Sequence, residues 1–241
     1  MIELPSEMSR EVGTMKPFIV RLWSGAFSLL RELTPLRIIR IRIIPRIKPD
    51  FRQDNTLNDA LIEAWAFGHF LLSMLALAVC SALSRHWCEY IAIVWGVVRV
   101  WEIVIVQINV LLFDWYKWYS AKKRDRDYAL VGYLRMVILL VHNYAEIIFW
   151  FAIIYLNRNW SAQKDTLSLF LESLNLSFVT MTTFGQTEVS PPGNLGKALT
   201  LIQSVIGLFM SLAVLARFIS LLPEPKTLDK YEQPLDHDLA V

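Results

Sequence analysis

The sequence predicts an all-α membrane protein with four transmembrane helices and one shorter helix that enters the membrane without crossing it. Of its 241 residues, 55% are hydrophobic and 19% are charged, whereas about a quarter of a soluble domain is charged. Four apolar stretches are each long enough to cross a bilayer, which takes about 20 residues of helix. We therefore expect most of the chain to be surrounded by lipid.

The four stretches are Leu61 to Leu83, Tyr90 to Phe113, Ala129 to Leu156 and Ala198 to Leu222. None contains proline, which would interrupt a helix. They divide the chain into a basic N-terminal segment (1–60), two spans with their loop (61–128), a two-span module (129–222) and a tail (223–241).

Basic residues flanking the spans predict the orientation. Ten precede the first span, five lie between the second and third, and three end or follow the fourth, whereas the opposite side has four. Because basic residues resist translocation, we expect both termini to be cytoplasmic in a multi-pass protein of the cell membrane. The first 17 residues lack a long apolar stretch, so we expect no cleavable signal peptide.

The N-terminal segment alternates large apolar residues with basic ones. Its basic cluster is Arg37, Arg40, Arg42, Arg46 and Lys48. We interpret it as an interfacial segment held to anionic lipids, which attract each basic residue by about 1 kcal/mol. The alternatives are a voltage-sensing helix and an arm that only enforces topology. The irregular spacing and the nearby prolines disfavour a voltage sensor.

About forty residues, 157–197, must leave and rejoin the same face of the membrane. Within them, apolar positions at helical spacing predict a helix from Asp165 to Val179, which is too short to cross a bilayer. Directly after it comes Thr-Met-Thr-Thr-Phe-Gly-Gln-Thr-Glu-Val-Ser-Pro-Pro, at residues 180–192. An ordinary turn at this place would leave the short apolar helix without a partner.

These residues resemble the pore loop of the potassium-channel superfamily, whose filter reads Thr-Val-Gly-Tyr-Gly-Asp. The resemblance implies that the third span is the outer helix, the short helix is the pore helix and the fourth span is the inner helix of a homotetramer. The implied ion filter is Thr182, Thr183, Phe184, Gly185, Gln186 and Thr187, with Glu188 at the pore mouth. A monovalent cation would bind at Thr183, Phe184 and Gly185.

The chemistry of these residues suits a cation that has left water. Backbone carbonyls and the Thr183 hydroxyl supply oxygens, and Gly185 allows the backbone conformations that aim carbonyls at the axis. Gln186-Thr187-Glu188 replaces Tyr-Gly-Asp, a departure that resembles cyclic-nucleotide-gated channels. We therefore expect a tetrameric cation channel, weakly selective between potassium and sodium, in which Glu188 attracts cations.

Gly207 lies near the middle of the fourth span. The resemblance places an inner-helix hinge there, and close packing against the pore helix is the alternative, because small residues are common where membrane helices meet. The sequence leaves both roles open.

Charged and histidine residues also interrupt the apolar spans. Arg99 and Glu102, three residues apart, can form a pair, as can His142 and Glu146, four apart. We expect pairs between helices that fix the first two spans to the third, with Arg135 and Glu63 close to the membrane surface. The alternative is a proton relay, a sensor or a hydrated pathway, as in a secondary transporter.

Further expectations concern chemistry and partners. Cys80 and Cys88 are expected to be separate thiols. We expect no enzymatic activity and no cofactor besides permeating potassium or sodium, no nucleic-acid partner and no soluble ligand-binding domain. A non-conducting scaffold or signalling protein with a degenerate pore loop is the remaining alternative.

Overall fold

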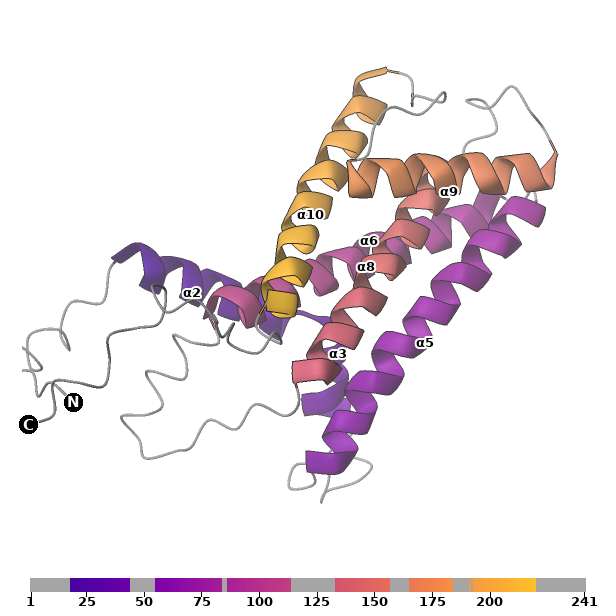
Figure 1. The fold of residues 1–241 in the computed structure, drawn as a ribbon. Helices are drawn as coiled ribbons and strands as arrows, with labels where there is room; N and C mark the ends of the chain where they lie inside the picture. The colour runs from indigo at the N-terminus through magenta and orange to yellow at the C-terminus, as the bar shows by residue number, and fades with distance from the viewer. Residues whose placement is uncertain are drawn as a thin grey trace, which may run out of the picture.

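A computed structural model describes residues 18–43, 55–83, 86–113, 133–156, 165–183, 191 and 193–219. Every element in this part of the chain is helical (Figure 1). The long helices are α5 (Asn55–Ala82), α6 (His86–Ile108), α8 (Tyr133–Tyr155) and α10 (Gly193–Ile219). The predicted all-α fold is confirmed.

Among the described residues, four helices are long and apolar enough to cross a membrane: Ala60–Ala82, Trp87–Leu111, Arg135–Tyr155 and Gly193–Ile219. The protein is therefore a multi-pass membrane protein. The fourth helix begins five residues before the predicted Ala198. Its first turn is too polar to belong to an apolar stretch, but glycine at position 193, with φ of 76°, allows the chain to turn into the helix.

Helix α8 is at the centre of the bundle and contacts α5, α6, α9 (Thr166–Thr182) and α10. Ile147, Trp150 and Ala152 of α8 are almost completely buried. Gly96 lets α6 approach α8 closely, because a Cβ there would lie 2.8 Å from the Trp150 ring. Packing around α8 therefore fixes the arrangement of the other spans.

Helix α9 lies across α8, with its C-terminal end beside α10 (Figure 1). Its 17 residues extend about 25 Å, short of the bilayer core of about 30 Å. The predicted helix ended too early, at Val179. It continues to Thr182, and in this last turn Thr180 and Thr182 donate their hydroxyls to the carbonyls of Leu176 and Phe178, so that both hydroxyls are satisfied within the helix.

The basic N-terminal segment is divided into short elements. These are α2 (Phe18–Glu32), α3 (Pro35–Ile38) and the π-helical η1 (Ile39–Ile43). In the part that the structure describes, Arg37 and Arg40 therefore lie on no continuous transmembrane helix, which contradicts the voltage-sensor interpretation. Arg46 and Lys48 lie outside the described residues.

Candidate pore module

The start of α9 is fixed by Asp165. Its carboxylate accepts a hydrogen bond from the backbone N–H of Ser168 at 3.1 Å, which caps the first turn of the helix. This bond lowers the pKa of Asp165 below its usual value, because it stabilises the charged form. The helix therefore begins at a defined residue.

The end of α9 is the first part of the predicted filter. Thr183 ends the helix in the left-handed conformation, with φ of 57°, which a β-branched residue adopts rarely and at a cost of about 1–3 kcal/mol. The last carbonyls of the helix carry partial negative charge. The partially negative end of α9 therefore lies at Thr182 and Thr183.

Helices α8, α9 and α10 meet at one junction near this end (Figure 1). Gly207 of α10 lies against the Met181 backbone, so that a Cβ at Gly207 would stand 2.9 Å from the carbonyl carbon. Tyr144 of α8 donates its hydroxyl to the Met181 carbonyl oxygen at 3.3 Å and lies 3.3 Å from the Ser211 hydroxyl. Of the two roles open for Gly207, this geometry favours close packing.

A second set of contacts joins the same helices one turn away. Gln203 of α10 is fully buried, and its side-chain N–H group donates to the Ser177 carbonyl at 3.0 Å and to the Ser177 hydroxyl at 2.8 Å. The Ser177 hydroxyl in turn donates to the Ile148 carbonyl of α8 at 2.7 Å. Hydrogen bonds between neutral groups thus tie α9 to both neighbouring spans.

The start of α10 is also closely packed. A Cβ at Gly196 would lie 2.7 Å from the backbone carbonyl of Pro191, at the other end of the predicted filter loop. Glycines at 196 and 207 therefore fit α10 against the two chain segments that flank the filter.

Two of the predicted filter residues, Thr182 and Thr183, lie in the described part of the chain. Phe184, Gly185, Gln186, Thr187 and Glu188 lie outside the described residues. Thr183 follows the last residue of α9, and Pro191 lies two residues before the first residue of α10. Because α9 and α10 contact each other, the two ends of the predicted filter segment are attached to neighbouring helices. Ser177 gave no recognisable pattern in the sequence, because its role depends on contacts with Gln203 and Ile148.

The intramembrane charges form pairs between helices, as predicted. Arg99 of α6 is 5% exposed and bonds to Glu102 at 2.6 Å and to Glu146 of α8 at 2.7 and 3.0 Å. Arg135 of α8 lies 2.7 Å from Glu63 of α5. These pairs connect the first two spans to the third.

The predicted pair between His142 and Glu146 is wrong. His142 instead contacts the Ile138 carbonyl at 2.8 Å and packs against the rings of α5. The Glu146 carboxylate is occupied by Arg99 and by the indole N–H of Trp150 at 3.0 Å. A guanidinium that binds both carboxylate oxygens is a stronger partner than an imidazole.

The two cysteines are separate thiols, as expected. Cys80 is buried in α5 and Cys88 is half-buried in α6, and neither forms a disulfide.

Residues 136–224 match a protein family described as "Ion channel". The matched range contains all but the first residues of α8 together with α9 and α10. The resemblance to the pore-loop channel superfamily is therefore confirmed for residues 136–224, which are similar to an ion-channel module. No curated protein and no solved structure matches the chain.

Proposed function

We propose that the protein is a homotetrameric cation channel of the cell membrane, with both termini in the cytoplasm, that conducts potassium and sodium with little discrimination. The observation that carries the proposal is the anchoring of α9 between α8 and α10 in a module that matches an ion-channel family. Passive conduction through such a module requires no covalent chemistry.

The filter of the proposed channel comprises Thr182 to Thr187, and Glu188 forms a ring of carboxylates at the mouth. The negative end of α9 and the hydroxyl of Thr183 favour a cation on this side of the junction. Glutamine at position 186 removes one potential carboxylate per subunit from the filter itself. Weak selectivity is expected because the second glycine of a potassium filter is absent.

The exposed surface of α10 supports assembly. Of an 18-residue apolar stretch in α10, only 22% is buried within one chain, whereas 50% of the corresponding stretch in α8 is buried. Large apolar side chains, among them Leu201, Val205, Leu208 and Leu212, are exposed along it. In a tetramer, neighbouring subunits cover part of this surface, and four copies of the filter segment surround one axis.

The experiment compares two glycine-to-alanine variants in planar bilayers. Gly185→Ala is expected to abolish unitary currents while the oligomer remains intact, because a Cβ opposes the filter backbone. Gly68→Ala is the matched control, since a Cβ at Gly68 in α5 meets nothing within 4 Å. Normal currents in a correctly assembled Gly185→Ala protein would refute the proposed filter.

A further inference from the structure

Helix α2 carries a row of large apolar side chains that the chain leaves uncovered. Phe18, Ile19, Leu22, Trp23 and Leu29 are each between 52% and 73% exposed. At 3.6 residues per turn, these five residues fall on an arc of about 140° on one side of the helix. An apolar stripe of this kind on a helix normally faces an apolar environment.

The rest of the protein contacts a different side of α2. Phe27 is half-buried, and its carbonyl oxygen accepts a hydrogen bond from the side chain of Asn109 at 3.0 Å. Phe27 lies about 110° around the helix from the centre of the apolar row, and the exposed Glu32 lies about 110° from it in the other direction. The helix therefore has three sides, of which one is apolar and exposed, one packs on the spans and one is polar.

The contacts of Phe27 fix the level of α2 in the membrane. Asn109 is fully buried, lies two residues before the end of the span Trp87–Leu111, and begins the π-helical η3 (Asn109–Phe113). Arg217, two residues from the end of the α10 span, donates to the Val110 carbonyl of η3 at 3.4 Å. The ends of two spans thus hold Phe27 at the boundary between hydrocarbon and headgroups, which is the cytoplasmic boundary in the predicted orientation.

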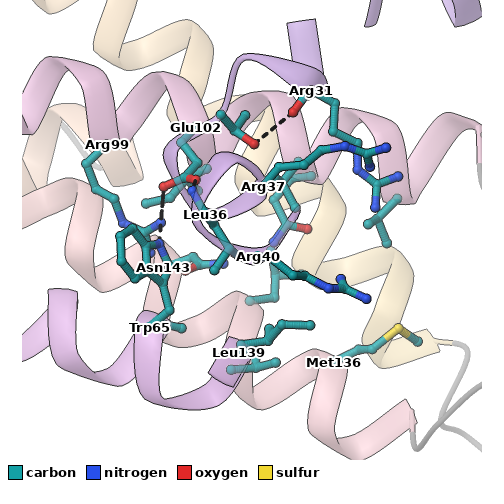
Figure 2. Close-up of a pocket in the computed structure, with 18 of the residues that line it drawn as sticks. Arg31, Leu36, Arg37, Arg40, Trp65, Arg99, Glu102, Met136, Leu139 and Asn143 are labelled. Atoms are coloured by element: carbon teal, nitrogen blue, oxygen red, sulfur yellow. Dashed lines mark hydrogen bonds and ion pairs between the residues drawn. The ribbon is translucent and has the colours of Figure 1, made fainter. Parts of the chain in front are cut away.

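The chain after α2 turns inward between the spans. The backbone N–H of Leu36 donates to Glu102 of α6 at 2.7 Å, and Glu102 also binds Arg99 at 2.6 Å (Figure 2). Glu102 precedes Asn109 by seven residues on α6, which places it about 10 Å deeper. Figure 1 shows α2 itself extending sideways from the bundle near the C-terminal end of α10. The end of α2 is therefore anchored from inside, while its length projects away from the spans.

We propose that α2 lies in the surface of the membrane, with its apolar row among the acyl chains and its polar side toward water. A helix in this position needs an apolar side and a polar side. The partner is the bilayer and not a second copy of the chain, because the spans hold α2 at a level where lipid surrounds the protein. The inference does not depend on whether the proposed filter conducts.

The proposal differs from an attachment through charge. The row consists of uncharged side chains, so that burial of apolar surface, and not attraction of the basic cluster to anionic lipid, keeps α2 in place. Such a contact is independent of lipid charge and of salt, whereas attraction between exposed charges is screened as the salt concentration rises.

The test measures the depth of α2 by electron paramagnetic resonance of the full-length protein in phosphatidylcholine vesicles. A nitroxide label is attached at Leu22→Cys or, as the matched control, at Ser28→Cys, which lies about 150° from the centre of the row. The native thiols are first replaced by Cys80→Ala and Cys88→Ser. Collisions of the label with oxygen, which concentrates in hydrocarbon, are compared with collisions with a neutral nickel complex, which stays in water.

We expect the ratio of oxygen to nickel collisions to be several-fold higher at Leu22 than at Ser28. A label at Leu29→Cys, two turns further along the row, should give the same result as the label at Leu22. Both ratios should remain the same when phosphatidylglycerol, an anionic lipid, is added to the vesicles and when the salt concentration is raised.

Three results would overturn the proposal. High nickel access at both Leu22 and Ser28 would place α2 in water. Little access of either reagent to Leu22 would show that another part of the chain, or a second copy, covers the row. A high ratio at Leu22 only in vesicles with phosphatidylglycerol would show that charge holds the helix. Circular dichroism and gel filtration establish that each labelled protein is folded, and the label at Leu29 decides the question if the one at Leu22 disturbs the fold.

Discussion

The first two spans on one side, and α9 and α10 of the pore module on the other, are attached to α8 by different chemistry. On one side, Arg99 and Glu146 form an ion pair that is almost completely buried between α6 and α8. On the other, α9 and α10 approach through glycine at 207 and through hydrogen bonds of Ser177 and Gln203. Ion pairs thus fix one half of the bundle, whereas small and neutral polar side chains fix the half that holds the predicted filter.

The difference has a physical reason. A full charge near a filter would change the potential that a permeating ion experiences, because charges interact strongly where water is scarce. Neutral hydrogen bonds and close backbone contacts position α9 without adding charge. Glu146 lies on α8 between Tyr144 and Ile148, which contact α9, but its carboxylate bonds to Arg99 of α6 and to Trp150.

The largest expected effect comes from removing the shared cation. Arg99→Met leaves Glu102 and Glu146 buried without it, and breaking a buried pair costs about 3–5 kcal/mol. The measurement is unfolding in mixed micelles, monitored by circular dichroism. The control is the triple change Arg99→Met, Glu102→Gln and Glu146→Gln, which should recover part of the stability. Wild-type stability in the single variant would mean that the ion pairs do not hold the spans.

A smaller loss is expected at the three-helix junction. A methyl group at position 207 is forced against the Met181 backbone, and overpacking costs about 1–3 kcal/mol. We expect Gly207→Ala to unfold earlier and to assemble poorly, whereas Gly68→Ala should be as stable as wild type or slightly more so. Thermal unfolding and oligomer size measure both effects. Normal stability with a lower open probability and an unchanged reversal potential would instead support a hinge at Gly207.

The sequence predicts the ion pairs of the first two spans better than it predicts the small-residue contacts of α9 and α10. Charges in apolar spans are conspicuous, and the Arg99–Glu102 pair follows from a spacing of three residues. The partner of Glu146 could not be predicted, because Arg99 is 47 positions away and only packing shows that it outcompetes His142. The four spans and the short helix were predictable because lipid requires long apolar segments.

Contacts between small residues were much harder to predict. Gly96 and Ser177 are ordinary members of apolar helices until Trp150 and Gln203 are seen beside them. The start of α10 at Gly193 and the end of α9 at Thr182 were also missed. The first turn of α10 and the last turn of α9 are rich in polar residues, so they lack the apolar periodicity from which the helices were predicted. The family resemblance placed Gly207 correctly on the inner helix, and the tertiary contact with Met181 distinguishes between its two roles.

The smallest effect is expected from the neutral hydrogen bonds. Gln203→Leu removes the donor to Ser177 at nearly constant volume, and such bonds between membrane helices are worth about 0.6 kcal/mol. The control is Ser204→Ala on the same helix, whose hydroxyl bonds to the Thr200 carbonyl within α10. Hydrogen exchange of the α9 amides should increase in Gln203→Leu and not in Ser204→Ala. Equal exchange in both variants would show that Gln203 does not anchor α9.

We propose that residues 182–187 form a weakly selective filter, and single-channel recordings in planar bilayers with potassium on one side and sodium on the other test this claim. We predict unitary currents carried by both ions, with a reversal potential close to zero. Changing Gln186 to Glu in the same recording should increase block by calcium, because it adds a carboxylate from each subunit. Absence of unitary currents in a well-folded protein, or flux only when a second solute gradient drives it, would contradict the claim.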